Sequence, residues 1–258
     1  MLRKLKEVFI KLFRKKIPVV VPPPAPGPVP SNPAGFFDDF KTLDHWIVSS
    51  WTAPGGSNLH QGKFKPEHAT IRDGALCLKL TQIETPDGIK SYGGEVTTKL
   101  KFGYGIYEFE VRASSTADTP NTSGDAISGS ITGCFNYGPA SVTEIDVEVE
   151  GLSARKNLTH MTSWRGESNP NQSTKVQPVS ATALPHRVFH KYAFVWTKNK
   201  IEYFRNGVLV ATHTTVVPSQ AAPMMFNHWG TNNPNWGGVS TPGVDRYMYV
   251  KNFKFVPL

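Results

Sequence analysis

The sequence lacks three features, each of which would have indicated a particular class of protein. No run approaches the roughly 20 consecutive apolar residues that a membrane-spanning helix needs. Only two residues are cysteine, Cys77 and Cys134, which are too few for a disulfide framework, and we expect both to be buried free thiols. The eight histidines are scattered along the chain, so we expect no metal site and no cofactor.

Positive charge is also scarce outside the first 16 residues. The 258-residue chain has a formal net charge of +8, and residues 1–16 supply six of these charges, through seven basic side chains and Glu7. The remainder is nearly neutral and has no basic stripe with which to contact phosphate groups. Nucleic-acid binding through the basic segment is therefore the weakest functional hypothesis, and we expect no nucleic-acid partner.

The first 35 residues differ in composition from the rest of the chain. Apolar residues in the segment 1–16 recur at spacings of three and four between Lys and Arg, which is typical of a basic amphipathic helix. Such a helix can lie on an anionic membrane or dock on a partner, although a solvated tail fits equally well. Residues 17–35 form a proline-rich, semi-rigid linker, so we expect a single domain at residues 36–258.

That domain has the pattern of an all-β protein. Short runs rich in β-branched and aromatic residues alternate with turn signals, and no segment of useful length has helical periodicity. Asn206-Gly207, between two such runs, predicts a tight hairpin, and Asp73-Gly74 predicts another turn. An antiparallel two-sheet sandwich fits best. The expected strands are Ala75–Leu80, Gly105–Arg112, Ser128–Phe135, Thr143–Val149, Tyr192–Thr197, Ile201–Phe204, Val208–Thr212 and Tyr247–Phe255.

One of these runs concentrates acidic residues on a single face. Side chains alternate along a strand, so Glu144, Asp146, Glu148 and Glu150 point to the same side. A solvated strand face would tolerate them, but the rest of the domain is not especially acidic. Glycoside hydrolysis uses such carboxyl pairs, one to attack the anomeric carbon and one to protonate the leaving oxygen. Residues i and i+4 are roughly 13 Å apart on a flat strand, so Glu144 and Glu148 would have to approach each other across a concave face.

The run Glu-Ile-Asp-Val-Glu at residues 144–148 resembles the active-site signature of glycoside hydrolase family 16, in the form without an inserted bulge residue. The resemblance implies a concanavalin A-like β-jelly-roll sandwich with a glycan in a concave cleft. It makes Glu144 the nucleophile, Asp146 the assisting acid and Glu148 the general acid/base. If the strand bulged, Glu150 would become a candidate for the acid. This form is similar to lichenases and xyloglucan transglycosylases.

The resemblance covers roughly residues 36–258 and extends to the expected substrate contacts. These are Glu95, Tyr137, His160, Trp164, Asn227, Trp229 and Trp236. Trp46, Trp51 and Trp196 are assigned to structural roles instead. Three departures concern the substrate and a metal. Val142 stands where lichenases have a tryptophan, and His160 stands where they have an asparagine. The C-terminal aspartate that helps hold calcium in some members is replaced in this chain, near Lys251. We therefore expect no structural calcium.

Two functions from different classes follow from these residues. The first is a retaining endo-β-glucanase or glucan transglycosylase that acts on β-1,3/1,4-linked polysaccharide and works as a monomer. The alternative is a non-catalytic glycan-binding sandwich, against which the intact acidic triad argues. A polysaccharide substrate implies an extracellular or cell-envelope location, yet residues 17–21 are a short apolar stretch with no evident cleavage site.

The basic segment generates the first testable prediction. We expect the full chain to bind liposomes that contain anionic lipid, and a chain that begins at Ser31 not to bind them, because the charges and the apolar stripe both precede that residue. Sedimentation with liposomes of neutral and anionic composition measures this. Equal behaviour of the two chains would make residues 1–16 a linker or a partner-binding arm.

Overall fold

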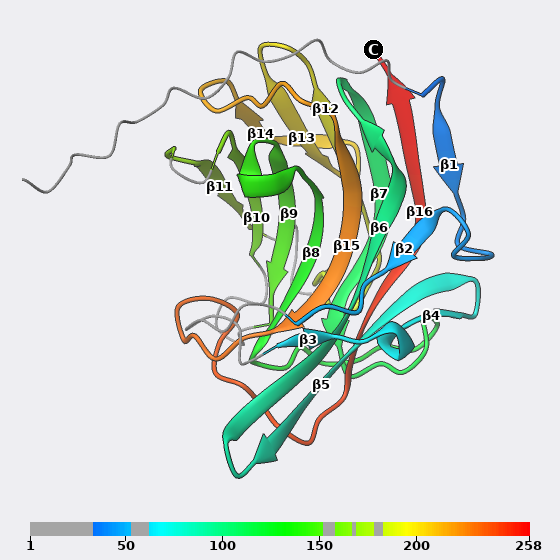
Figure 1. The fold of residues 1–258 in the computed structure, drawn as a ribbon, viewed down its shortest axis with the longest axis vertical. Helices are drawn as coiled ribbons and strands as arrows, with labels where there is room; N and C mark the ends of the chain where they lie inside the picture. The colour runs from blue at the N-terminus through cyan, green and yellow to red at the C-terminus, as the bar shows by residue number, and fades with distance from the viewer. Residues whose placement is uncertain (1–32, 53–61, 152–157, 167–168, 178–182) are drawn as a thin grey trace, which may run out of the picture.

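The computed structural model describes residues 33–52, 62–151, 158–166, 169–177 and 183–258. The expected helix at 1–16 and nearly all of the linker at 17–35 lie outside these residues. Within them the secondary structure is strand, apart from the 3-10 turns Pro66–His68 and Pro139–Ser141, and no helix could span a membrane. The strands form two curved layers (Figure 1) that are antiparallel except where Lys63–Phe64 pairs in parallel with residues 92–93, which confirms the predicted all-β sandwich.

The first layer carries the acidic strand. Its strand order is β11-β10-β9-β8-β15-β6, so that β9 is flanked by β10 on one side and β8 on the other. The short strands β2 and β3 add to β6. Their bounds are β2 Trp46–Val48, β3 Lys63–Phe64, β6 Gly88–Phe102, β8 Ser130–Tyr137, β9 Glu144–Glu150, β10 Thr159–Trp164, β11 Gln172–Val176 and β15 Ala222–Gly230.

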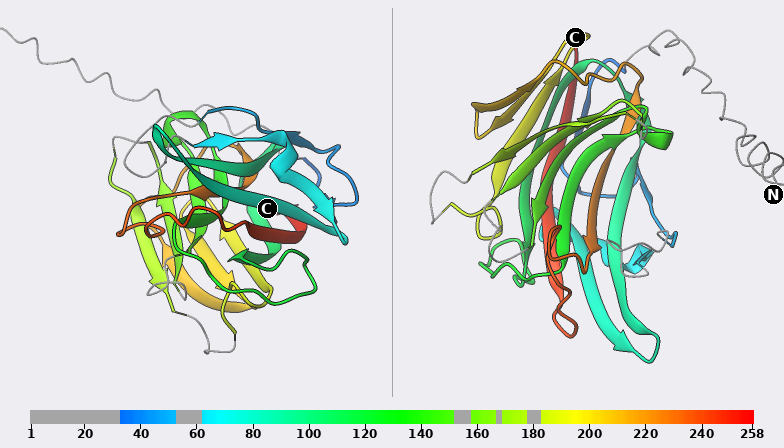
Figure 2. Two further views of the ribbon diagram at one scale, coloured as in Figure 1. Left: turned by 90° about the horizontal axis from the view of Figure 1, so that it is seen from below. Right: turned by 90° about the vertical axis from the view of Figure 1, so that its left-hand side faces the viewer.

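The second layer has the strand order β5-β16-β7-β12-β13-β14, with β1 on β16 and β4 on β5. The hairpin of β5 and β6 joins the layers, because residues 81–85 pair with 88–92. Figure 2 shows the two layers curving together. The bounds are β1 Phe36–Asp38, β4 Ala69–Arg72, β5 Ala75–Thr85, β7 Gly105–Ser115, β12 His190–Trp196, β13 Ile201–Arg205, β14 Val208–His213 and β16 Arg246–Pro257.

Aromatic side chains fill the space between the layers. Tyr107 stacks on Phe194 with ring centroids 4.3 Å apart, and Phe226 of the first layer meets Phe109 and Phe253 of the second. All five side chains are fully buried. Each buried ring contributes about 1.5–3 kcal/mol relative to an exposed one, so this core fixes the position of the layer that bears the acidic strand.

Local turn chemistry agrees with the sequence. Asn206 and Gly207 join β13 to β14 with φ of 52° and 78°, which confirms the predicted hairpin. Asp73 and Gly74 turn β4 into β5 in the same manner. Cys77 and Cys134 are both buried and unpaired, as expected.

Strand β6 was not predicted, although it is the longest strand of the first layer. Gly93-Gly94 in its middle reads as a turn signal in the sequence. In the structure, a Cβ at Gly93 would collide with the carbonyl oxygen of His228, and one at Gly94 with that of His68. Both glycines therefore permit close approach of neighbouring backbone, which a local pattern does not reveal.

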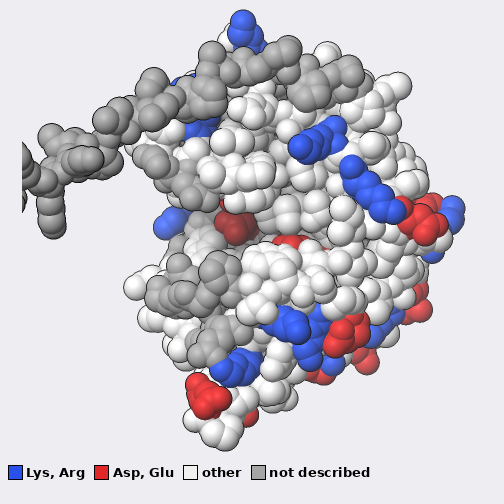
Figure 3. Space-filling model, viewed as in Figure 1, with Lys and Arg blue, Asp and Glu red and all other residues white. Residues whose placement is uncertain are grey.

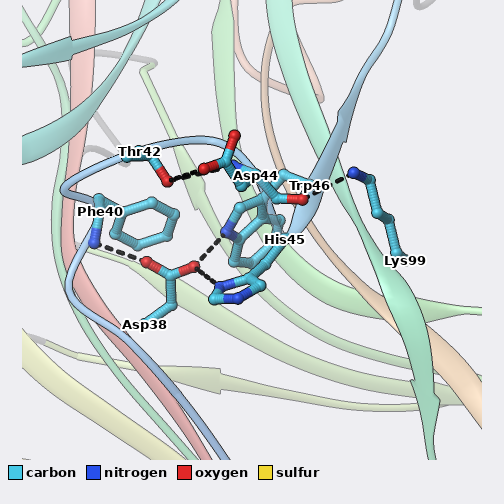
Figure 4. Close-up of polar contacts among 7 residues, drawn as sticks. All are labelled: Asp38, Phe40, Thr42, Asp44, His45, Trp46 and Lys99. Atoms are coloured by element: carbon cyan, nitrogen blue, oxygen red, sulfur yellow. Dashed lines mark hydrogen bonds and ion pairs between the residues drawn. The ribbon is translucent and has the colours of Figure 1, made fainter.

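A buried carboxylate anchors the segment that leads into β2. One oxygen of Asp38 accepts the backbone N–H of Phe40 at 2.7 Å, and the other accepts the indole N–H of Trp46 at 2.9 Å. His45 Nδ1 also lies 2.9 Å from that second oxygen (Figure 4). Because Phe40 has a positive φ of 53°, this network holds a backbone conformation that a phenylalanine rarely adopts.

The anchor predicts a loss of stability on substitution. Asp38→Ala leaves the buried indole N–H of Trp46 without its acceptor, so we expect the free energy of unfolding to fall by about 2–3 kcal/mol. Denaturant titration measures the change. Asp39→Ala is the matched control, since Asp39 makes a surface ion pair with Lys41 and its loss should change stability by less than about 0.5 kcal/mol. Equal losses in the two variants would contradict the anchoring role.

Candidate active site

The acidic strand is regular along its whole length. Residues 144–150 of β9 pair with β8 and β10 without a register shift, so the strand has no bulge. Ile145, Val147 and Val149 are buried in the core, and the four carboxylates project from the opposite side. We call the side chains of Glu144, Asp146, Glu148 and Glu150 the acidic face. Within it Glu144 and Glu148 are partly exposed, whereas Asp146 and Glu150 are buried.

Cross-strand pairing brings distant residues beside Glu148. Directly opposite it stand His160 on β10 and Gly133 on β8. Gly133 in turn pairs with Asn227 on β15, and Asn227 with Glu95 on β6. Paired residues of an antiparallel sheet point to the same face, so these side chains form one row across the first layer. The row unites three residues that the sequence assigned to substrate contacts.

Parallel rows place the remaining predicted contacts. Glu144 lies between Trp164 on β10 and Tyr137 on β8. At the opposite end of β9, Glu150 is paired with Ile131, and Ile131 with Trp229. Figure 3 shows acidic atoms recessed in a hollow on the side of the molecule where these strands curve. The aromatic side chains named by the sequence therefore border the acidic face.

The glycine in the central row makes room for a neighbour. A Cβ at Gly133 would collide with the side-chain oxygen of Asn227. The amide of Asn227 is oriented from its other end, because its Nδ2 donates to Oε2 of Glu95 at 3.1 Å. Its buried Oδ1 accepts no hydrogen bond from the described residues. This oxygen is enclosed against Gly133, in the row that also carries Glu148.

Glu95 is held by residues that the sequence did not assign to the site. Its Oε1 accepts the hydroxyl of Ser49 at 2.6 Å and the indole N–H of Trp51 at 3.0 Å. Trp51, expected to be structural, is 46% exposed and therefore lies outside the core. Its neighbour Trp46 and the distant Trp196 are buried, as expected. No local pattern separates the three tryptophans; only the fold does.

The acidic face changes the proton affinity of its own members. Burial, the largest cause, together with the charges of Glu144 and Glu148, raises the pKa of Asp146 well above its usual value, and a hydrogen bond with Trp164 opposes this. Burial also raises the pKa of Glu148 to about 8, with further contributions from Glu144 and Glu150. Glu148 thus holds a proton at neutral pH, as a general acid requires.

Glu150 differs from the other three carboxylates in the polar groups that lie next to its two oxygens. Its Oε1 lies 2.6 Å from Nε2 of His160, and its Oε2 accepts the backbone N–H of Gly237 at 3.0 Å. The ring of His160 meets that of Trp236 edge to face, with centroids 5.0 Å apart. The structure therefore brings Trp236, which lies in a loop, to the same end of the acidic face.

No metal site is evident in the part of the chain that the structure describes. No group of three or more His, Cys, Asp or Glu side chains there is arranged to hold an ion. Lys251, at the position discussed for calcium, makes a 2.8 Å ion pair with Glu110. The ring nitrogens of His186 and His190 contact backbone carbonyls of Ser114 and Ala183.

Comparison with known proteins agrees with this geometry. Residues 57–242 match the family model described as glycosyl hydrolases family 16. The endo-1,3-1,4-beta-glycanase ExoK of Rhizobium meliloti (strain 1021) is 33% identical over 214 residues, which cover 79% of this chain and 71% of that protein. A beta-glucanase of Paenibacillus polymyxa is 30% identical over 225 residues, or 82% and 86% of the two chains. The solved beta-glucanase of Bacillus licheniformis shares the fold, with a TM-score of 0.74, 19% identity and coverage of 88% of this chain and 100% of that one.

The electrostatics of the acidic face predict a titration. We expect the Glu148 carboxyl to titrate near pH 8, and Glu144→Gln to lower that pKa, because a neighbouring negative charge that disfavours ionisation is removed. Carboxyl-carbon NMR with labelled glutamate measures both. Glu84→Gln, at an exposed position on β5, should leave the Glu148 signal unchanged. A Glu148 pKa near 4.5 in the unmodified protein would contradict the assignment.

Proposed function

The chain belongs to family 16 of the glycosyl hydrolases, and from this premise we propose that it is a retaining endo-β-glucanase that cleaves mixed 1,3-1,4-linked β-glucan. One observation supports the mechanism: Glu144, Asp146 and Glu148 share one face of an unbulged strand, where burial and the neighbouring carboxylates raise the pKa of Glu148 to about 8. The linkage is inferred from relatives named as endo-1,3-1,4-beta-glycanase and beta-glucanase.

The first chemical step breaks the glycosidic bond. The Glu144 carboxylate attacks the anomeric carbon and forms a covalent ester, while Glu148 gives its proton to the oxygen that leaves with the second sugar chain. Loss of this proton makes Glu148 anionic. Asp146 lies between the two and keeps its own proton through burial, so it can donate a hydrogen bond without adding a third charge.

The second step releases the first sugar chain. Glu148, now a carboxylate, accepts a proton from an incoming water as the water oxygen attacks the anomeric carbon, and the Glu144 ester is cleaved. Both carboxyl groups return to their starting protonation states. A sugar hydroxyl in place of water would give transglycosylation by the same proton transfers. Two inversions at one carbon retain its configuration.

Glycan binding is supported by the rows that flank the acidic face. Asn227 stands in the same row as Glu148, and Glu95 orients its amide through the 3.1 Å hydrogen bond. Tyr137, Trp164 and Trp229 are partly exposed on the same face and offer flat rings to the apolar faces of pyranoses. Val142 in place of an expected tryptophan leaves one aromatic surface fewer near Glu144.

The first 35 residues of the chain also have a proposed role. We propose that residues 1–16 tether a monomeric domain at 36–258 to an anionic membrane surface outside the cytoplasm, with residues 17–35 as the spacer. Their charge and apolar periodicity support this role.

Activity assays test the proposal. We expect release of reducing sugar from barley β-glucan and lichenan in preference to laminarin, xyloglucan, agarose and carrageenan. Glu144→Ala should reduce kcat by at least about 1,000-fold, because no other described group attacks the anomeric carbon. Glu148→Ala should lose activity on polysaccharide but still form the covalent ester from a β-oligoglucosyl fluoride, whose leaving group needs no proton, and release of that ester should then be slow because the water has lost its base.

The controls separate catalysis from binding. Glu84→Ala, an exposed carboxylate on β5, should keep full activity. Glycan binding without turnover on any of these polysaccharides would instead support the non-catalytic module. If xyloglucan were the one polysaccharide cleaved, the proposed mechanism would stand but the proposed substrate would be wrong.

A further inference from the structure

The proposed mechanism leaves the fourth carboxylate of the acidic face unused. Glu150 has no exposed surface, and a buried carboxylate is costly unless it is paired. Its two oxygens contact different elements: Oε1 lies 2.6 Å from Nε2 of His160 on β10, and Oε2 accepts the N–H of Gly237 at 3.0 Å. Glu150 therefore links β9 to a neighbouring strand and to the loop that follows β15.

His160 is equally enclosed. Its side chain is 4% exposed, so little of it is available for direct contact with a sugar. One ring nitrogen meets Glu150, and the ring packs edge to face on Trp236 at an interplanar angle of 75°. The position of the Trp236 ring thus depends on a contact with a strand that is remote in the sequence.

The loop at residues 231–238 has little freedom around Trp236. The carbonyl of Trp236 accepts the Thr231 hydroxyl at 2.7 Å, and its N–H donates to the carbonyl of Asn233 at 2.9 Å. Gly237 follows with a φ of 73°, and a Cβ there would collide with Thr231. Glu150 is the side chain of the catalytic strand that holds this backbone, through the N–H of Gly237.

The location of these contacts indicates which half of the glycan they serve. His160 stands directly opposite Glu148, on the β10 side of the catalytic strand. Asn227 and Glu95 lie on the other side, across β8. Because Glu148 donates its proton to the leaving oxygen, the sugar that departs lies next to Glu148, and Trp236 stands at that end.

We propose that Glu150 and His160 are a positioning pair that holds Trp236 as the wall against which the leaving sugar rests. The proposal depends on the glucanase function argued above. Neither member of the pair takes part in proton transfer. The pair acts through Trp236, and so determines how well the enzyme uses a sugar as its leaving group.

Two substrates that differ only in the leaving group test this role. Mixed-linkage β-glucan requires a bound sugar on the leaving side, whereas a β-oligoglucosyl fluoride has none. We expect His160→Ala and Trp236→Ala each to lower kcat/KM on the polysaccharide about tenfold, chiefly through KM, because a positioned substrate contact is lost. On the fluoride, both variants should stay within about twofold of the unmodified enzyme. The double variant should be no worse than the poorer single variant, because the two side chains act as one unit.

His190→Ala is the matched control for loss of a buried histidine. His190 is buried on β12 of the other layer, where its Nε2 contacts the carbonyl of Ala183 at 2.9 Å. Its substitution should leave the ratio of the two kcat/KM values unchanged. If His160→Ala does not fold, His160→Gln provides the same comparison, because it keeps a donor for Glu150 and loses the ring.

Several results would overturn the positioning role. Equal losses on both substrates would show that the pair only supports the fold of the site. Independent, multiplicative losses in the double variant would show that His160 does not act through Trp236. If the unmodified enzyme cleaves both substrates and the variants lose no activity on either, the glucanase function stands and only the positioning role of Glu150 and His160 is rejected. Failure of the unmodified enzyme on both substrates would reject the glucanase function, and the pair's role with it.

Discussion

Repulsion among four carboxylates on one face of a buried strand is the constraint around which the first layer is organised. The strand accommodates these carboxylates in more than one way. Glu148 and Asp146 have raised pKa values that favour their neutral forms, so less charge remains on the strand. Glu150 keeps polar partners in His160 and Gly237, and Glu95, which lies on β6 at the other end of the central row, accepts three hydrogen bonds. One repeated residue type therefore supplies chemically distinct groups, which is what acid and nucleophile roles require.

The apolar side chains on the opposite face of the same strand fix which side the carboxylates occupy. Ile145, Val147 and Val149 are packed in the aromatic core, so a slip of one residue would bury four carboxylates and expose three apolar side chains. The unbroken pairing with β8 and β10 reflects that penalty. Register in turn sets the rows across the sheet. The alternation of apolar and acidic residues along β9 therefore places three side chains in the hydrophobic core and four carboxylates on the acidic face.

Short-range patterns predicted the parts of the fold that depend on neighbouring residues. The Asn206-Gly207 hairpin and the alternation at 144–150 are local properties, and both are confirmed. Strand β6 was missed, because Gly93 and Gly94 serve contacts with backbone from distant segments. Trp51 was assigned only a structural role for a related reason: its partner Glu95 is 44 residues away, and nothing near Trp51 in the sequence identifies that contact.

By itself, the sequence determined the all-β class, the acidic alternation and, through its resemblance to a family signature, the residues expected to carry catalysis. Only the tertiary structure decided which side chains share a row with Glu148, which carboxyl keeps a proton, and that Glu150 and His160 meet beside Trp236. The physical reason is that periodicity is encoded in adjacent residues. Register between strands, burial and the distance between charges arise only when segments far apart in the chain are packed together.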